Sequence, residues 1–372
     1  MKILIIGNHQ IGLYKFRREL LERLVSERYD VFISVPDGPF TDKIKAIGCK
    51  VIINGYMDRR GTNPVHEFQL FRHYKAILKE LKPDLVFTYT IKPNVYGGYL
   101  CGKKRIPYIV NVTGLGSSIQ HGGMLGRMAL SLYRGGLKRA EKVFFQNNSN
   151  LTFMIDHGVV KNEKYALLPG SGVNTDQYSY KLYPDSSDGV VFSTIGRIMR
   201  DKGIEELLEA AEIIKQKHPE TIFRLIGEFD EGYEERVSKY VARGIIQYVG
   251  FKEDVRDDIA DSHAIIHASH HEGMSNVLLE AASIGRPVIA TDIPGCIETF
   301  NPGVSGISFS PCNTESLVSA IEKFLSLSSR QWEDMGKAGR NKMELEFNRD
   351  IVIEKYMSEI RTIIRRKDNG FV

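Results

Sequence analysis

The chain has 372 residues, 42% of them hydrophobic and 26% charged, and carries a formal net charge of +4. This balance is typical of a soluble globular protein, and the length exceeds what a single hydrophobic core usually serves, so we expect two domains. The charge is unevenly divided: residues 1–183 hold 27 Lys and Arg against 14 Asp and Glu, whereas the rest of the chain holds 23 against 32.

The basic first half predicts an anionic partner, either a phosphorylated substrate or a phospholipid surface; a solvated surface without a role is the alternative. Nucleic acid is disfavoured, because no helix-turn-helix, zinc-finger or aromatic-and-basic strand pattern accompanies the charge. No apolar run approaches a membrane span, and Ile3–Ile6 is too short for a secretory leader, so we expect a cytoplasmic protein.

The cysteines show neither paired spacing nor a nearby histidine pattern. They therefore predict no disulfide framework and no zinc signature, and we interpret all of them as small buried or incidental residues. They are Cys49, Cys101, Cys296 and Cys312.

Short apolar runs in the first half alternate with stretches of helical periodicity, such as Lys15–Ser26 and Glu67–Leu81. This repeated β-α order predicts a parallel sheet covered by helices. The expected strands are Lys2–Ile6, Asp30–Val35, Lys50–Ile53, Leu85–Tyr89, Tyr108–Val112, Val143–Gln146 and Tyr165–Leu168.

The segment Pro169–Gly189 is rich in Gly, Pro, Asp and Ser, and predicts a hinge or linker before a second β-α series. We place the domains at 1–183 and 184–350, with a C-terminal helix in 351–372 that crosses back to the first domain. The second series predicts strands Val190–Gly196, Phe223–Gly227, Ile246–Val249, Ala264–Ala268 and Pro287–Thr291, and helices Ile204–Lys217, Tyr233–Arg243 and Ser275–Ile284. Both domains read as doubly wound and Rossmann-like, and the cleft between them is the default ligand site.

Two cations follow the first strand of the second half. Arg197 and Lys202 lie in the loop before the helix that opens at Gly203. A guanidinium and an ammonium can together neutralise a diphosphate. Two solvated loop cations are the alternative, which loses weight because a glutamate pair occupies the matching place in a later β-α unit.

That pair is Glu272 and Glu280. Gly273 permits a close approach of backbone and ligand, and the N–H groups of residues 274–277 are expected to form a helix N-terminus suited to an anion. Glu280 is expected about 12 Å further along the helix, so the two carboxylates can hold different parts of one ligand. Each glutamate alone could instead be a cap or a surface residue.

A resemblance to a known family rests on two strings, Gly196-Arg197 with Lys202-Gly203, and Glu272-Gly273 with Leu279-Glu280-Ala281. They resemble the retaining glycosyltransferases of glycosyltransferase family 4, whose fold is GT-B. The first-half strings are similar to the bacterial branch that builds capsule, O-antigen or N-glycan precursors on polyprenyl diphosphate. These strings are Leu13-Tyr14-Lys15-Phe16-Arg17, Ile91-Lys92-Pro93-Asn94-Val95-Tyr96-Gly97 and Thr113-Gly114-Leu115-Gly116.

The resemblance implies a role for each matching residue. Arg197 and Lys202 would contact the donor diphosphate, Glu272 the sugar and Glu280 the ribose, with Glu272, Arg197 and Lys202 as the catalytic residues. Gly12 would face the diphosphate, and Phe251 would line the base unless it packs in the core. The remaining donor contacts would come from Gly273, Met274, Ser275, Asn276 and Val277.

The implied reaction moves a hexose or N-acetylhexosamine from a UDP-sugar to a polyprenyl-diphosphate-linked saccharide, with retention of configuration, no metal and no cofactor. The acceptor hydroxyl would attack on the face from which the nucleotide leaves, and the leaving phosphate would take the proton. Many members carry a histidine near the positions of Asn111–Thr113. That histidine is absent here, and nearby His121 is more simply an incidental loop residue.

An amphipathic stretch places Arg127, Arg134 and Lys138 on one stripe, with Leu125, Met128, Ala129 and Leu132 gathered opposite. Such a helix could lie at an anionic membrane surface or pack on its own sheet. We expect peripheral attachment to the inner face of the membrane, supported by basic residues such as Arg59 and Arg60. The residues assigned to acceptor or membrane are Lys15, Arg17, Lys92, Thr113, Arg127, Arg134 and Lys138.

Other functions stay open at this point. A GT-B sugar-nucleotide epimerase could use a similar cleft, and a transferase could act on a soluble or non-polyprenyl acceptor. A catalytically silent binding subunit is also possible. An NAD enzyme or a kinase is disfavoured, because the loop Gly7–Gly12 lacks both the Gly-x-Gly-x-x-Gly spacing and the P-loop ending.

Overall fold

The computed structural model describes residues 1–58, 61, 63–115, 119, 123–160, 164–230 and 232–369. Arg59, Arg60, Gly116 and His121, which were named above, lie outside these residues. The chain divides into two compact units, the first formed by Met1–Ser171 with the residues from Val352 onward, the second by Gly172–Ile351.

This division falls earlier than the boundary expected after Tyr183, because residues 178–183 pack on the second unit. The backbone N–H of Lys181 donates to the Ile284 carbonyl at 3.0 Å. The buried guanidinium of Arg286 donates to the carbonyls of Lys181 at 3.0 Å and Leu182 at 2.6 Å. These bonds tie this part of the predicted linker to the C-terminal end of α11 in the second unit.

Within its described residues, the first unit holds a seven-stranded parallel sheet of order β3-β2-β1-β4-β5-β6-β7. Its strands are β1 (Lys2–Ile6), β2 (Asp30–Val35), β3 (Lys50–Ile53), β4 (Leu85–Tyr89), β5 (Tyr108–Val112), β6 (Lys142–Phe145) and β7 (Tyr165–Leu167). The helical elements are α1 (Gln10–Ser26), α2 (Thr41–Ala46), α3 (Pro64–Leu81), the π-helical turn η1 (Pro93–Gly97), α4 (Gly98–Lys104), α6 (Gly123–Leu137), α7 (Asn148–Asp156) and α14 (Arg349–Asp368).

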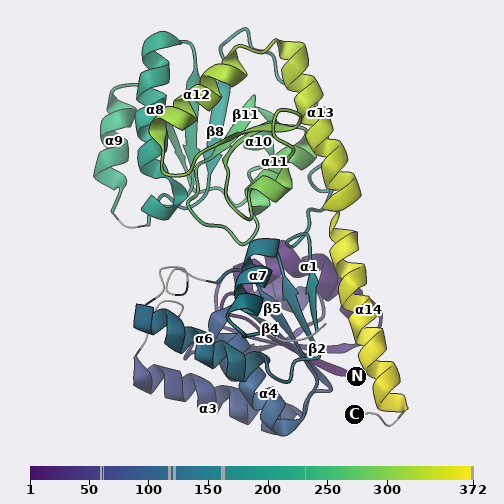
Figure 1. Cartoon of the computed structure of the whole chain (residues 1–372). Helices are drawn as coiled ribbons and strands as arrows, with labels where there is room; N and C mark the ends of the chain where they lie inside the picture. Colours follow the sequence, from purple (N-terminus) through teal and green to yellow (C-terminus); the bar gives the residue numbers. More distant parts are fainter. Residues whose placement is uncertain are drawn as a thin grey trace. The chain divides into compact units, whose positions relative to one another are not determined.

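Alternate residues of these strands feed two cores, one on each face of the sheet. On one face, Leu4 and Ile6 pack with buried residues of α3, α4 and α6, three helices that lie on the same side of the sheet in Figure 1. On the other face, Ile3 and Ile5 pack with α1 and α14, including Tyr356. The first unit is therefore a three-layer α/β/α domain.

The second unit repeats this architecture with a parallel sheet of order β10-β9-β8-β11-β12-β13 in the part of the chain described. Its strands are β8 (Val191–Ile195), β9 (Ile222–Ile226), β10 (Gln247–Gly250), β11 (Ala264–His267), β12 (Val288–Thr291) and β13 (Gly306–Phe309). The helices are η2 (Arg200–Lys202), α8 (Ile204–Lys217), α9 (Glu234–Ala242), α10 (Arg256–Ala260), α11 (Asn276–Ile284), η3 (Ile297–Thr299), α12 (Thr314–Leu325) and α13 (Ser329–Glu346).

The strand order reverses direction at β8 and β11, which are neighbours although β9 and β10 separate them in sequence. Loops that leave two such strands diverge above the carboxyl edge of the sheet, and ligands of doubly wound folds bind there. Arg197 and Lys202 follow β8, and Glu272 follows β11. The fold thus brings the predicted cations and carboxylate to one point.

The start of the first helix differs from its prediction. Helix α1 begins at Gln10, because the His9 side chain accepts the N–H of Ile11 and caps the helix. Gly12 therefore lies in the first turn of α1 and not in a loop. None of the helices in the described residues combines the length and apolarity needed to cross a membrane.

Candidate functional site

The loops after β8 and β11 meet through a charge pair. The Nζ of Lys202 lies 2.5 Å from the Oε1 of Glu272 and 3.3 Å from the Oγ of Ser269. A glycine must follow Lys202, because Gly203 has a φ of +69° and a Cβ there would lie 2.1 Å from the Ala268 carbonyl oxygen. The turn that carries Lys202 can therefore pack against the end of β11.

His267, the last residue of β11, contacts the carboxylate of Glu272. Its Nε2 lies 3.0 Å from the Oε1 of Glu272 and 3.1 Å from the Oγ of Ser275, and the ring is buried. Burial alone would raise the pKa of Glu272, but the hydrogen bond from His267 and the charge of Lys202 outweigh it and hold this pKa well below its usual range. Glu272 is therefore an ionised acceptor.

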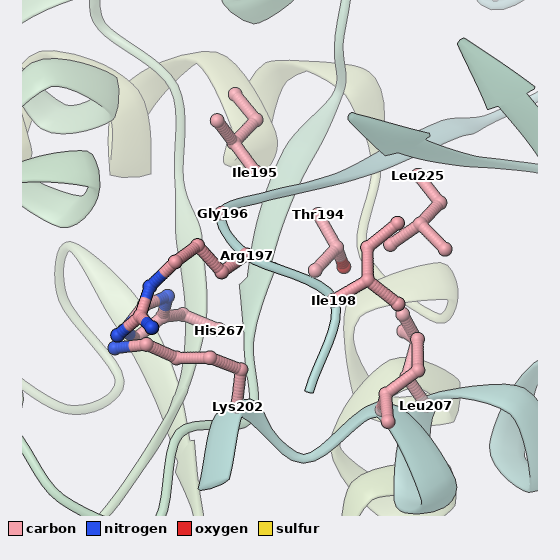
Figure 2. Close-up of a pocket in the computed structure, with 10 residues that line it drawn as sticks. Thr194, Ile195, Gly196, Arg197, Ile198, Lys202, Leu207, Leu225 and His267 are labelled. Carbon is pink, nitrogen blue, oxygen red and sulfur yellow. The ribbon is translucent and has the colours of Figure 1, made fainter. Parts of the chain in front are cut away.

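Arg197 extends toward the same region and is held by Asp230, whose Oδ2 accepts from Nη1 at 2.6 Å. Its side chain is 38% exposed, so it can also face a ligand. Figure 2 shows the guanidinium of Arg197, the ammonium of Lys202 and the imidazole of His267 turned toward one another beside a pocket that all three line. We call Arg197, Lys202, His267 and Glu272 the donor cluster.

The start of α11 is only in part the anion site expected from the sequence. The N–H of Ser275 donates to the Gly295 carbonyl at 2.8 Å, so it is not available to a ligand. The Ser275 hydroxyl caps the helix by accepting from the N–H of Leu278, and Met274 is buried. Asn276 and Val277, both partly exposed, form the first turn of the helix beside Gly273.

The residues expected at the ribose and the base lie in the same unit. Glu280 is partly exposed in the middle of α11 and interacts with the Tyr178 hydroxyl, whose pKa is raised by burial and by this carboxylate. Phe251 follows β10 with 58% of its surface exposed, which rules out the core packing considered for it. Both remain predicted ligand contacts.

The expected acceptor residues of the first unit do not form one surface. Arg17 is buried, where it lies over the Tyr89 ring at 5.4 Å, so it does not contribute to a membrane surface, and its contact with the acceptor stays a prediction. Lys92 is also structural: its Nζ donates to the carbonyls of Asp58 at 2.6 Å and Gly61 at 2.7 Å and contacts Glu67 at 2.5 Å.

Three more of the predicted residues lie near the carboxyl edge of the first sheet. Gly12 has nothing within 4 Å of the position of a Cβ, so its face of α1 is open. Lys15 and Thr113 are partly exposed, on α1 and just after β5. Asn111, where the family histidine was sought, is buried and donates from Nδ2 to the Thr88 carbonyl at 3.1 Å, so it serves the sheet.

Helix α6 has a buried face, an exposed apolar face and an exposed basic face. Leu130, Tyr133 and Leu137 are buried against the sheet. The apolar residues expected to oppose the basic stripe do not pack on the sheet, because Leu125, Met128 and Leu132 are 67%, 57% and 44% exposed; only Ala129 is partly buried. Met124 extends this apolar strip and is 80% exposed.

The basic stripe borders the apolar strip. Arg127, Arg134 and Lys138 are exposed, and Arg134 donates to the His157 carbonyl at 2.6 Å. Arg134 and Lys138 also line a cavity of about 470 Å³ together with His157 and Lys164. The C-terminal end of α6 is therefore strongly basic.

Three residues of the site were missed by the sequence analysis: His267, Ser269 and Asp230. Each lies at or just after the carboxyl end of a predicted strand, where polar residues of a doubly wound domain meet ligands. His267 had the clearest signal, because an imidazole interrupts the apolar run Ala264–Ala268 near its end.

Two family models match the chain. The model described as "Glycosyl transferase 4-like" matches residues 2–147, and the model described as "Glycosyl transferases group 1" matches residues 183–342. The second match contains the whole donor cluster. The two matches occupy most of the chain and fall on its two halves in order.

Among curated proteins, the N,N'-diacetylbacillosaminyl-diphospho-undecaprenol alpha-1,3-N-acetylgalactosaminyltransferase of Campylobacter jejuni is 25% identical over 382 residues, covering 98% of this chain and 100% of that protein. The UDP-Gal:alpha-D-GlcNAc-diphosphoundecaprenol alpha-1,3-galactosyltransferase of Escherichia coli is 21% identical over 367 residues, covering 93% and 91%. Both relatives are thus similar over nearly their full lengths.

Among solved structures, Anabaena HepE in complex with UDP-glucose superposes with a TM-score of 0.78 at 19% identity, covering 97% of this chain and 99% of that one. At this identity the likeness concerns the fold alone. It confirms the prediction of a GT-B fold built from two parallel-sheet α/β domains.

Proposed function

Because the chain belongs to the glycosyltransferase family that these two models describe, we propose that it moves a hexose or N-acetylhexosamine from a UDP-sugar to a polyprenyl-diphosphate-linked saccharide in surface polysaccharide or glycan synthesis. The observation that carries this proposal is the donor cluster, where two cations and an ionised carboxylate converge at the switch point of the second sheet. The named relatives are transferases, which supports sugar transfer over epimerisation.

In this proposal Lys202 and Arg197 bind the donor diphosphate. The bond from the anomeric carbon to the diphosphate oxygen breaks in the transition state, and negative charge builds on the departing nucleotide. Cations already held in place by Asp230 and Glu272 stabilise that charge without reorganising, which is the largest electrostatic contribution to such a reaction. These two side chains supply positive charge where other enzymes use a metal ion.

Glu272 accepts hydrogen bonds from the hydroxyls of the transferred sugar. An ionised carboxylate accepts such hydrogen bonds more strongly than a neutral carboxyl group does, and the lowered pKa of Glu272 keeps it ionised. His267 fixes the carboxylate, and Ser275 fixes His267, so both act as positioning residues. Glu280 binds the ribose and Phe251 stacks on the uracil.

We further propose that the reaction retains the anomeric configuration of the transferred sugar. Both relatives are named as α-1,3-transferases. The common UDP-hexoses are α-linked, so an α product means that the acceptor attacks on the face from which UDP leaves. The acceptor hydroxyl then forms the new C–O bond and its proton passes to the leaving diphosphate. Glu280 lies in α11, whereas Glu272 lies in the loop before it, about two helical turns away. The two carboxylates are therefore too far apart to act as the acid and nucleophile of a retaining glycosidase.

In this proposal the acceptor binds to the first unit. We propose that this unit attaches peripherally to an anionic membrane surface through α6. The exposed strip Met124, Leu125, Met128 and Leu132 inserts among the acyl chains, while Arg127 and Lys138 face the phosphates. Apolar insertion beside a basic stripe is the pattern of interfacial helices. A membrane-bound enzyme meets a lipid-linked acceptor at high local concentration.

The experiment has two stages. A panel of nucleotide sugars is first screened for thermal stabilisation of the full-length protein, which identifies the base and the sugar. Turnover with that donor is then measured against a polyprenyl-diphosphate-linked saccharide and against the same saccharide without lipid. Transfer to the lipid-linked acceptor supports the proposal. Transfer to the free saccharide alone would replace it with a soluble acceptor, and isomerisation without acceptor would indicate an epimerase.

A further inference from the structure

Three side chains of different chemistry meet beside the donor cluster. Glu206 lies in the first turn of α8, His270 follows β11 and Cys312 follows β13. Their ligand atoms all lie within 4.8 Å of one another, and the Nε2 of His270 is 3.1 Å from the Oε1 of Glu206. The second sheet therefore brings together a carboxylate from a helix and an imidazole and a thiol from two loops.

This ligand set suits one class of metal ion. Thiolate and imidazole are preferred by Zn²⁺, whereas Mg²⁺, Ca²⁺ and Mn²⁺ prefer oxygen ligands. Ligands of a tetrahedral zinc ion at about 2.0–2.3 Å stand roughly 3.2–3.8 Å apart, so the three side chains need to close by about 1 Å. Side-chain rotations can supply a movement of that size, and the exposed Cys312 leaves a path for the ion.

Two further features point to a ligand at this place. The side chain of Glu206 is only 14% exposed, and its Oε2 is buried without a hydrogen-bond partner among the described protein groups. Cys312 has a φ of +54°, a left-handed conformation that a non-glycine residue adopts at some energetic cost. An unsatisfied carboxylate oxygen and a strained cysteine thus stand side by side.

Nucleophilic catalysis by the thiol is the competing interpretation of a Cys-His-Glu group. A catalytic cysteine needs a lowered pKa. Burial and the nearby charge of Glu206 instead raise the pKa of Cys312, and the charge of Arg200 only partly offsets this. A bound cation would remove the repulsion between the Glu206 carboxylate and the Cys312 thiolate. The same repulsion would hinder a nucleophilic thiolate.

We propose that Glu206, His270 and Cys312, with a water molecule as the fourth ligand, bind a zinc ion that joins the first turn of α8 to the loops after β11 and β13. The ion is structural and takes no part in bond breaking. The N–H of His270 donates to the Asp201 carbonyl at 2.9 Å, and His270 is next to Ser269, which contacts Lys202. The zinc site therefore braces both loops that carry the donor cluster.

Thiol reactivity tests this inference in the full-length protein. Cys312 is exposed, whereas Cys49, Cys101 and Cys296 are buried, so a thiol reagent such as Ellman's reagent reports on Cys312 in the native state. The rate is measured after chelator treatment, with and without added Zn²⁺. We expect zinc to slow the reaction at least about tenfold and Mg²⁺ to leave it unchanged. Loss of the fast-reacting thiol in Cys312→Ser verifies the reporter.

Matched variants locate the other ligands. His270→Gln and Glu206→Gln are expected to lose the protection, whereas His271→Gln, at the neighbouring exposed histidine, keeps it. Circular dichroism checks folding, and either ligand variant suffices if the other fails to fold. Zinc should also raise the melting temperature of the wild type but not of Cys312→Ser. Absence of protection in the wild type, or protection that persists in folded His270→Gln or Glu206→Gln, would overturn the site.

Discussion

The ammonium of Lys202 and the carboxylate of Glu272 form an ion pair across the two loops that diverge at the switch point, with 2.5 Å between Nζ and Oε1. Both side chains are mostly buried, at 26% and 15% exposure. Each group therefore holds the other in place before a donor arrives. In the proposed function, the donor diphosphate would therefore meet a cation that is already oriented, and the sugar would meet a carboxylate that is already ionised.

Removal of the cation is expected to reduce turnover sharply. Lys202→Met removes the point charge that faces the departing diphosphate, and the loss of one such electrostatic contact typically lowers kcat by about 10²–10³-fold. Steady-state rates with saturating donor measure this. Lys239→Met is the matched control, because Lys239 is paired with Glu235 on the exposed surface of the same unit and should keep full activity.

A second variant separates catalysis from folding. Lys202→Met leaves the mostly buried carboxylate of Glu272 without its cation, so the melting temperature of this variant should fall. The double variant Lys202→Met/Glu272→Gln removes both charges and should regain much of that stability. Its turnover should nevertheless stay low. Recovery of turnover together with stability would show that Lys202 serves only the fold.

The pH profile tests His267 as a positioning residue. The hydrogen bond from His267 is the largest contribution that lowers the pKa of Glu272, so in His267→Gln this pKa should be higher. A carboxylate with a higher pKa takes up a proton at a higher pH. The acid limb of kcat/KM should therefore move to higher pH in the variant. A profile that falls in amplitude without any shift would assign His267 a purely structural role.

Glu280 is expected to recognise the ribose. Glu280→Gln should weaken the binding of UDP by roughly tenfold, the cost of one charge-assisted hydrogen bond. The same variant should bind 2′,3′-dideoxy-UDP as the wild type does, since that ligand lacks the hydroxyls. Calorimetric titration measures both. Tyr178→Phe, which removes the group that interacts with Glu280, tests whether the carboxylate depends on that support. Equal losses for both nucleotides would place Glu280 away from the ribose.

The buried His263 is expected to make the folded protein less stable in acid. Burial lowers its pKa from 6.5 to about 4. Between these values the unfolded chain binds a proton and the native state does not, so the free energy of unfolding falls as pH decreases from 6.5 to 4, by at most about 1.4 kcal/mol per pH unit. His263→Asn keeps an acceptor for the Val191 N–H, which bonds the ring at 3.0 Å, and should flatten this slope. Urea unfolding over the range measures it.

Membrane attachment is expected to need both exposed faces of α6. The double variant Leu125→Ser/Met128→Ser should reduce flotation with anionic liposomes at all salt concentrations. Arg127→Gln/Lys138→Gln should reduce it mainly at low salt, where electrostatic attraction is strongest. Lys239→Gln/Lys337→Gln, which changes two exposed lysines of the second unit, is the control. Absence of wild-type binding at low salt would remove the membrane contact.

The sheets of this fold could be predicted from the sequence, because fully buried parallel strands are short apolar runs. The bounds of β1, β2, β3, β4 and β5 match the expected runs at both ends. Strand β13, Gly306–Phe309, was missed, since Gly and Ser dilute its apolar signal. The start of α1 was also missed, because His9 is an uncommon cap and only its side-chain contact reveals it.

The site was predictable in its charged members and not in their partners. Arg197, Lys202 and Glu272 follow strands that the pattern predicted, and the structure shows that these two strands are neighbours in the sheet. Their pairing with Asp230 and His267 depends on rotamers and loop paths that no local pattern encodes. For the same reason the burial of Arg17 and the internal bonds of Lys92 could not be foreseen, because both appear in the sequence as ordinary surface cations.

A crystal structure of the full-length protein with its UDP-sugar donor will show whether the donor cluster binds the diphosphate. We expect diphosphate oxygens within hydrogen-bonding distance of Lys202 Nζ and the Arg197 guanidinium, and sugar hydroxyls bonded to the Glu272 carboxylate. A nucleotide bound elsewhere, with the Lys202–Glu272 pair out of reach of its phosphates, would contradict this expectation.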